Sequence, residues 1–311
     1  MTLTILFAAG PDMWAEYERP LRDALAKVAP ETRLVTEADP AEVDYVIYAP
    51  KSPLQDFTPY TRLKAVLNLW AGVETIVGND TLKAPLVRMV DDEGLTRGMV
   101  EWVAGHVLRH HLGMDAHIVN PDHVWDHRPP PLAPERRVTI LGLGALGSAC
   151  AEALARFDFD LSGWSRSPKD LAGIACHAGP EGLMPALDGA EIVVMLLPNT
   201  PETENVLNAE TISKLAPGAV VINPGRGPLI DDDALLAALD DGRLGHATLD
   251  VFRTEPLPAE HPFWAHPKVT VTPHIASETR VSTASQAIAD NIARCEAGAP
   301  LVGRVDRDAG Y

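Results

Sequence analysis

Short apolar runs recur along the whole chain, separated by amphipathic or turn-rich stretches. In the first third of the chain this alternation is a βα pattern, which predicts a first, smaller parallel sheet. The runs that we expect to form its strands are Leu3 to Ala8, Val43 to Tyr48, Leu63 to Leu69 and Leu86 to Val90.

A long helix is expected next, from Gly98 to His117, followed by the proline-rich segment Pro129 to Pro134. Prolines so dense cannot lie inside a helix or a central strand, so this segment is predicted to be a connector. A second and more regular βα series begins after it, which places the chain in the α/β class. Its expected strands are Arg137 to Leu143, Leu161 to Trp164, Glu191 to Leu197, Ala219 to Asn223, Ala247 to Phe252 and Val269 to Thr272. Its expected helices are Ala145 to Arg156, Asp231 to Leu239 and Ser282 to Ala297.

Three consecutive aspartates, 231 to 233, open one of these helices. A cation site is the sharper interpretation of such a triplet. We favour helix capping, because carboxylates in a first turn complement the helix dipole.

Composition narrows the class of protein. With 311 residues, 46% of them hydrophobic, the chain can bury a full core and form two domains or one large one. A formal net charge of -17 opposes binding to nucleic acid and to anionic membranes, so neither is an expected partner. If the ligands are anions, local arginines and helix N-termini must bind them.

The expected cellular location is inferred from segments that we do not find in the sequence. No secretory leader is visible and no apolar run approaches the roughly 18 residues of a membrane span, so we expect a soluble, cytoplasmic protein. The three cysteines, Cys150, Cys176 and Cys295, are odd in number and widely spaced. They suit a reducing compartment and packing roles rather than a disulfide or a zinc site.

A glycine-rich fingerprint follows the strand predicted from Arg137 and opens a helix. In Gly142-Leu-Gly144-Ala145-Leu146-Gly147, the first glycine permits the tight turn, the second lets a pyrophosphate approach the backbone, and the third allows close packing of helix on strand. The anion would rest on the helix N-terminus. The alternative is an ordinary glycine turn, which the strand and helix context disfavours.

The end of the next strand bears on the choice of dinucleotide. NAD sites usually place a carboxylate there for the ribose hydroxyls, whereas a nearby arginine accommodates the 2′-phosphate of NADP. This chain has Ser165, Arg166 and Ser167, with Lys169 beyond them. We therefore expect NADP(H) to be preferred over NAD(H), with both accepted; the alternative is a solvated basic turn.

Three later segments each place a chemically active residue after an apolar run. Arg226 lies in Asn223-Pro-Gly-Arg-Gly, where flanking glycines would leave room for a ligand and the planar guanidinium suits a small carboxylate. His274 follows Thr-Pro at a strand end, and Glu255 is its candidate partner, a pair suited to general acid chemistry. Parallel sheets bring successive strand ends to one crevice, so one active site is expected. The alternatives are a structural arginine at a helix C-terminus, a structural histidine and an exposed loop carboxylate.

A histidine cluster raises the question of a metal. His106 and His110 lie one helical turn apart and His111 is adjacent, but Val107 stands where a zincin would have glutamate. We expect no metal and interpret these histidines as helix-surface or interface residues.

Taken together, the segments resemble the D-isomer-specific 2-hydroxyacid dehydrogenases, and among them the glyoxylate/hydroxypyruvate reductase A type. The resemblance covers essentially the whole chain. Besides the fingerprint it rests on five motifs: 69–74 (LWAGVE), 197–203 (LPNTPET), 223–227 (NPGRG), 249–258 (LDVFRTEPLP) and 266–274 (HPKVTVTPH), together with the terminal 305–311.

The resemblance implies roles for matching positions. Arg226 looks like the substrate-anchoring arginine, Glu255 the carboxylate paired with the catalytic histidine, and His274 the acid/base. Asp250 and Pro198 look like cofactor contacts. The loop Trp70-Ala71-Gly72-Val73 resembles the one whose N–H groups hold the substrate carboxylate. Two departures, Pro224-Gly225 before the arginine and the large Trp70, leave the fine substrate preference open.

The resemblance also implies an architecture and a reaction. Two Rossmann-like, doubly wound domains are expected: a discontinuous substrate domain, 1–102 with 280–311, and an inserted NAD(P)-binding domain, 103–279, in a homodimer. The implied activity is reduction of glyoxylate to glycolate and of hydroxypyruvate to D-glycerate. The alternatives are a dehydrogenase for another 2-hydroxyacid and an NAD(P)-sensing protein without turnover.

Overall fold

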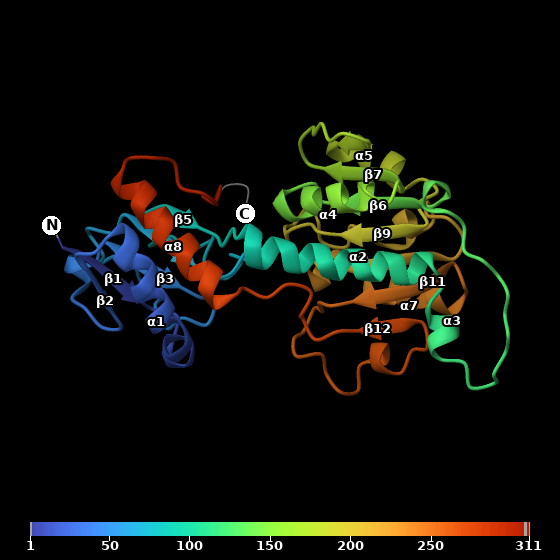
Figure 1. The fold of residues 1–311 in the computed structure, drawn as a ribbon, viewed down its shortest axis with the longest axis horizontal. Helices are drawn as coiled ribbons and strands as arrows, with labels where there is room; N and C mark the ends of the chain where they lie inside the picture. Colours follow the sequence, from blue (N-terminus) through green and yellow to red (C-terminus); the bar gives the residue numbers. More distant parts are fainter. Residues whose placement is uncertain (1, 308–309, 311) are drawn as a thin grey trace. The chain divides into compact units, whose positions relative to one another are not determined.

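Two parallel β-sheets form the framework of the computed structural model, which describes residues 2–307 and 310 (Figure 1). The chain divides into two compact units, Met1–Leu95 with Glu278–Tyr311 and Thr96–Ser277. The second unit is thus inserted, along the sequence, within the first. The predicted fold class, α/β with two parallel-sheet units, is confirmed.

The smaller unit has a five-stranded parallel sheet in the order β2-β1-β3-β4-β5. Its strands are β1 (Leu3–Phe7), β2 (Thr32–Val35), β3 (Tyr45–Tyr48), β4 (Ala65–Asn68) and β5 (Leu86–Val87). Helices α1 (Pro11–Val28) and α8 (Val281–Glu296) bury Leu21 and Ile288 against one face of the sheet. Short turns are Pro40–Glu42 and the π-helical Asp92–Thr96.

The larger unit has a seven-stranded parallel sheet in the order β12-β11-β10-β9-β6-β7-β8. Its strands are β6 (Arg137–Leu141), β7 (Asp160–Ser165), β8 (Ile174–Ala178), β9 (Ile192–Met195), β10 (Ala219–Asn223), β11 (Leu244–Leu249) and β12 (Val269–Val271). The strand order reverses between β6 and β9. In open α/β sheets, ligands bind outside the carboxyl ends of the strands at such a switch point.

Helices cover both faces of this larger sheet. Val103 of α2 (Arg97–His111) and Leu154 of α4 (Ala145–Ala155) are buried in the core of one face. Leu187 of α5 (Gly179–Leu187), Ile212 of α6 (Ala209–Ile212) and Leu235 of α7 (Asp232–Asp240) are buried in the core of the other. The remaining short elements are α3 (Asp115–Ile118) and the 3-10 turns Ala133–Glu135, Gly227–Leu229 and Pro262–Trp264.

The expected helix from Gly98 to His117 is wrong at its C-terminal end. Helix α2 stops at His111, and Gly113 takes the left-handed conformation with φ of 62°. The N–H groups of Gly113 and Met114 donate to the carbonyls of His110 and Arg109, at 3.2 and 3.0 Å. This is the Schellman arrangement, which satisfies the last carbonyls of a helix and ends it.

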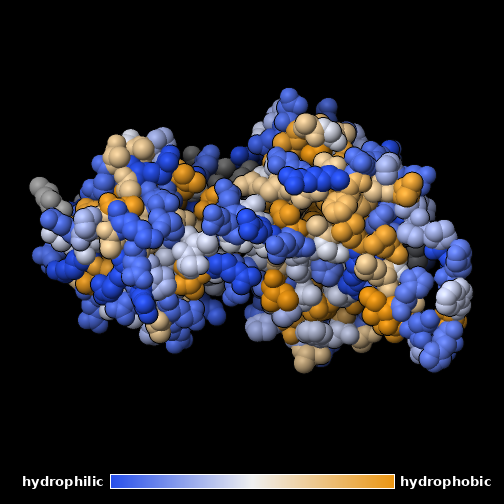
Figure 2. Space-filling model, in the orientation of Figure 1, coloured by the Kyte–Doolittle hydropathy of each residue, from blue (hydrophilic) through white to orange (hydrophobic). Residues whose placement is uncertain are grey.

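The interpretation of the aspartate triplet as a cap is confirmed. Asp231 is the N-cap of α7, and its carboxylate accepts from the N–H of Ala234 at 3.1 Å. In the part of the chain that the structure describes, no helix is both long and apolar enough to cross a bilayer. Figure 2 shows polar residues spread over the visible face, with hydrophobic residues among them mainly on the larger unit.

Candidate active site

The glycine-rich turn after β6 has the geometry of an anion-binding site. Gly142 has φ of 107°, and a side chain there would begin 2.5 Å from the carbonyl oxygen of Leu196. A side chain at Gly147 would begin 1.7 Å from the carbonyl oxygen of Gly142. Both positions therefore require glycine. Gly147 lets α4 pack closely on the end of β6, and Gly142 lets the backbone after β9 approach this turn.

The second glycine faces open space. A side chain at Gly144, the N-cap of α4, would meet none of the described atoms within 4 Å. Among the described residues no side chain caps this helix. The first N–H groups of α4, including those of Ala145 and Leu146, thus point at a site that suits a phosphate.

The end of β7 lies beside this turn, because the N–H of Gly142 donates to the carbonyl of Trp164 at 2.8 Å. Ser165 is the last residue of β7, is buried, and donates its hydroxyl proton to the carbonyl of Ser167 at 2.8 Å. Arg166 is exposed. Its charge helps to lower the pKa of Glu202, after the larger effect of the Thr200 hydroxyl. Arg166 thus lies near the 198–203 loop.

Arg226 lies in the loop after β10, where Asn223 fixes the backbone. The buried amide of Asn223 donates to the carbonyl of Arg226 at 2.9 Å and accepts from the N–H of Gly225 at 3.1 Å. The guanidinium is half-buried and donates to the carbonyl of Gly225 at 2.7 Å.

The glycines beside Arg226 have a different structural role from the one expected. A side chain at Gly225 would begin 2.7 Å from the carbonyl oxygen of Met195, and one at Gly227 would begin 2.0 Å from the backbone of Phe252. These glycines make room for neighbouring backbone and not for a ligand. The expectation that they leave space for the substrate is wrong, although the expected place of Arg226 at a strand end is right.

Glu255 and His274 form the predicted pair. The Nδ1 atom of His274 lies 2.7 Å from the Oε2 atom of Glu255, and Oε1 of Glu255 accepts from the N–H of Phe252 at 2.9 Å. Half of the His274 side chain is exposed, at 49%. The carboxylate thereby fixes which ring nitrogen carries the inner proton, and leaves Nε2 for a ligand.

Asp250 anchors the turn that carries His274. It is fully buried, and its carboxylate accepts from the Thr272 hydroxyl at 2.5 Å and from the N–H groups of Ile275 and Ala276 at 2.9 and 2.8 Å. Its carbonyl accepts from the N–H of His274 at 2.8 Å. These bonds hold His274 at φ of 55°, a left-handed conformation that is uncommon outside glycine. No local sequence pattern indicates this anchoring role for Asp250.

The Trp70–Val73 loop belongs to the smaller unit. The buried amide of Asn68 donates to the carbonyls of Trp70 and Gly72 at 2.8 and 2.7 Å. Trp70 is 42% exposed, whereas Val73 is buried. Sequence reasoning missed two asparagines, Asn68 and Asn223, each of which organises a loop within its own unit. Their common position at the end of an apolar strand was the available clue.

The histidines of α2 do not form the expected surface. His111 is buried and meets the edge of Phe159, while Nε2 of His110 lies 2.8 Å from the hydroxyl of Thr248. The rings of His110 and His246 lie 5.0 Å apart. In residues 2–307 and 310 no group of three or more His, Cys, Asp or Glu side chains could hold a metal ion. Helix α2 packs His110 against Thr248 of the sheet. This contact with a distant strand, and not the sequence pattern of the helix, determines where the histidine lies.

The partly buried His110 and His246 predict an acid-sensitive fold. Burial lowers the pKa of His110 to about 3 and that of His246 to about 4, from an ordinary value of 6.5. Below pH 6.5 the unfolded chain takes up protons that the folded chain refuses, so stability present above pH 6.5 is lost as pH falls toward 4. Replacing His110 by Gln should flatten this loss, with about 2 to 4 °C of melting temperature for each kcal/mol involved. Thermal melts at pH 7.5, 6 and 5 measure it, and parallel curves for the two proteins contradict the prediction.

Comparison with known proteins places these features in a family. The sequence profile of the D-isomer specific 2-hydroxyacid dehydrogenase NAD binding domain matches residues 104–276. The chain is 43% identical over 258 residues to glyoxylate/hydroxypyruvate reductase A of Serratia proteamaculans, covering 80% of this chain and 82% of that protein. It is 38% identical over 301 residues to the Salmonella typhi protein of the same name, covering 93% and 95%.

Solved structures agree in fold over the full length. A D-isomer specific 2-hydroxyacid dehydrogenase from Xanthobacter autotrophicus, in complex with NADPH and MES, superposes with a TM-score of 0.92 at 40% identity and covers 100% of both chains. The NADPH-dependent glyoxylate/hydroxypyruvate reductase of Sinorhizobium meliloti, in complex with NADP and sulfate, gives a TM-score of 0.86 at 34% identity, over 100% of this chain and 99% of that one.

Proposed function

The chain belongs to the D-isomer specific 2-hydroxyacid dehydrogenase family, and we propose that it is an NADPH-preferring reductase of glyoxylate to glycolate and of hydroxypyruvate to D-glycerate. The observation that carries the proposal is the 2.7 Å pair of His274 and Glu255. Glu255 follows β11 and His274 follows β12. Arg226 follows β10, which pairs with β11 in the same sheet. A nucleotide sensor has no need of such a pair.

The chain's own residues fit the dinucleotide. The open N-terminus of α4, with Gly142, Gly144 and Gly147 shaped by neighbouring backbone, would hold the pyrophosphate. Arg166 would bind the 2′-phosphate. When bound, NADPH supplies the hydride. Pro198 and Asp250 remain proposed cofactor contacts, and the domain roles proposed are substrate binding for 1–102 with 280–311 and cofactor binding for 103–279.

The protein's part in the reaction is to orient the 2-oxoacid and move a proton. Arg226 would hold the carboxylate and, through its other donors, stabilise charge that develops on the carbonyl oxygen. Protonated His274 would donate from Nε2 to that oxygen, while Glu255 at Nδ1 stabilises the imidazolium before transfer. The substrate contacts predicted for Trp70, Ala71, Gly72 and Val73 stay a prediction.

A substrate panel tests the proposal directly. Steady-state kinetics with glyoxylate, hydroxypyruvate, phenylpyruvate and 2-oxoisocaproate, each with NADPH and NADH, should give the highest kcat/KM for the two small acids with NADPH. A best rate with phenylpyruvate would refute the small substrate but not the dehydrogenase. Nucleotide binding with no turnover of any 2-oxoacid would favour a sensor.

Cofactor preference should depend on Arg166. Replacing Arg166 by Ala is expected to weaken NADPH binding by roughly tenfold or more, since a hydrogen bond to a charged group contributes about 1.5 to 3 kcal/mol. NADH lacks the 2′-phosphate and should lose little. Fluorescence titration of both cofactors measures this, with the exposed Arg19 of α1 replaced by Ala as control. Equal losses for NADPH and NADH rule the assignment out.

We also propose a homodimer located in the cytoplasm. Exposed large hydrophobic residues gather between positions 112 and 132, where Trp125 is 91% exposed. Large exposed apolar residues that gather in this way support association with another chain. Light scattering should give the mass of two chains, and a mass of one chain would remove the dimer from the proposal.

A further inference from the structure

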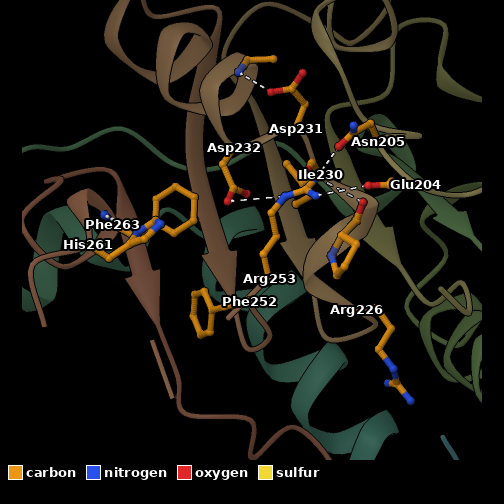
Figure 3. A network of polar contacts seen from close by, with 12 residues as sticks. Glu204, Asn205, Arg226, Ile230, Asp231, Asp232, Phe252, Arg253, His261 and Phe263 are labelled. Carbon is orange, nitrogen blue, oxygen red and sulfur yellow. Dashed lines mark hydrogen bonds and ion pairs between the residues drawn. The ribbon is translucent and has the colours of Figure 1, made fainter. Parts of the chain in front are cut away.

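Arg253 lies in the 249–258 motif, and its side chain points toward Asn205, Ile230 and Asp232 (Figure 3). Its guanidinium donates to the carbonyl of Ile230 at 2.5 Å, to the carbonyl of Pro228 at 3.4 Å, and to the side-chain oxygen of Asn205. One side chain therefore ties together the loops that follow β9, β10 and β11.

Each of two tied loops carries a proposed catalytic residue. On one side, Arg226 is the N-cap of the 3-10 turn Gly227–Leu229, and Arg253 holds the carbonyls within and after that turn. On the other side, Arg253 lies inside the turn that Glu255 closes by accepting from the N–H of Phe252. The two loops also touch directly, because a side chain at Gly227 would begin 2.4 Å from the N atom of Arg253.

Two carboxylates help to hold the Arg253 guanidinium in this position. Oε1 of Glu204 lies 3.6 Å from Nη1 and Oδ2 of Asp232 lies 3.7 Å from Nε. Burial raises the pKa of the Asp232 carboxyl, and the positive charge of Arg253 counters that rise. The Arg253 side chain is only 33% exposed. A cation with two carboxylates and three other acceptors is held far more firmly than a surface ion pair.

We propose that Arg253 is a positioning residue that sets the placement of Arg226 relative to the Glu255–His274 pair. This rests on the proposed function. Arg253 belongs to the loop that carries Glu255 and binds the loop that follows Arg226, so it acts through these loops. Its loss should misplace the carboxylate anchor against the proton donor, and leave the dinucleotide site on α4 intact.

The test compares Arg253→Met and Arg253→Lys with a matched control, Arg243→Met. Arg243 has the same chemistry elsewhere in the unit: it donates to the carbonyls of Ile212, Ser213 and Leu215. For each variant the measurements are the melting temperature, the Kd for NADPH, and kcat and KM for glyoxylate across pH. The control corrects for a general loss of stability.

Arg253→Met should lower kcat/KM by about tenfold to 100-fold, the scale on which small misplacements act. This fall should come from both a lower kcat and a higher KM. The alkaline limb of the pH profile should move to lower pH, because Glu255 is held less firmly. The Kd for NADPH should stay within about twofold of the wild-type value. Arg253→Lys keeps the charge but not the fork, and should recover part of the loss. If Arg253→Met does not fold, the lysine variant decides: it must still show the lower kcat/KM and the shifted limb.

Two results overturn the proposal. One is a kcat/KM for the folded Arg253 variant within about twofold of wild type. The other is a loss no greater than that of Arg243→Met at an equal fall in melting temperature. Failure of the proposed function itself looks different, because the unaltered protein would then turn over no 2-oxoacid.

Discussion

Replacing His274 by Ala is expected to lower kcat for 2-oxoacid reduction by about 100-fold to 10,000-fold, the usual contribution of a positioned general acid. The reason is structural: Nδ1 is held by Glu255 at 2.7 Å, so the ring presents Nε2 as the donor. NADPH affinity should be retained, because the glycine-rich turn and Arg166 lie after other strands. Steady-state kinetics and a fluorescence titration measure the two properties separately. A variant with half the wild-type kcat would remove His274 from the reaction.

A companion variant, Glu255→Gln, tests the pairing. Gln keeps the size of the side chain but loses its charge, and the charged imidazole then loses the carboxylate that favours it. More acid is needed to protonate the ring, so the pH profile of reduction should move to lower pH. An unmoved profile would reject the pairing even if the rate fell.

Replacing Arg226 by Lys should lower kcat/KM for glyoxylate and hydroxypyruvate by about tenfold to 100-fold while NADPH affinity changes little. Arg226 already donates to the carbonyl of Gly225 at 2.7 Å. A planar guanidinium can keep that bond and still offer other donors to a carboxylate, whereas an ammonium has no such fork. Arg243→Lys serves as control, since Arg243 binds three carbonyls away from this loop. Parallel losses for substrate and cofactor would show that the variant disturbs the whole unit and not the anchor.

Much of this site could be predicted because its chemistry is local. Gly147 and the capping Asp231 act on backbone within a few residues, so their spacing is visible in the sequence. Arg226 and His274 follow strongly apolar strands, and the topology of parallel sheets brings such strand ends to one edge. The exposed edge strands β2 and β8 were missed, because residues that are only partly buried leave a weak hydrophobic pattern.

What the sequence could not reveal depends on distant partners. Gly225 and Gly227 were expected to face a ligand, but backbone from Met195 and Phe252 takes that space. His110 was expected at a surface, yet Thr248, far along the chain, offers it a buried hydroxyl. The anchoring by Asp250 is of the same kind, since it works only once β11 and β12 are paired.

The left-handed backbone of His274 also bears on how a bound complex could be captured for crystallography. Asparagine adopts this conformation more readily than other residues with a side chain, whereas alanine is strained in it. The asparagine amide is not an acid at neutral pH, so it cannot protonate the substrate. Its N–H group can still donate a hydrogen bond to Glu255. His274→Asn is therefore the substitution of choice for a folded, silent protein in which an unreacted 2-oxoacid and reduced cofactor persist together through crystal growth.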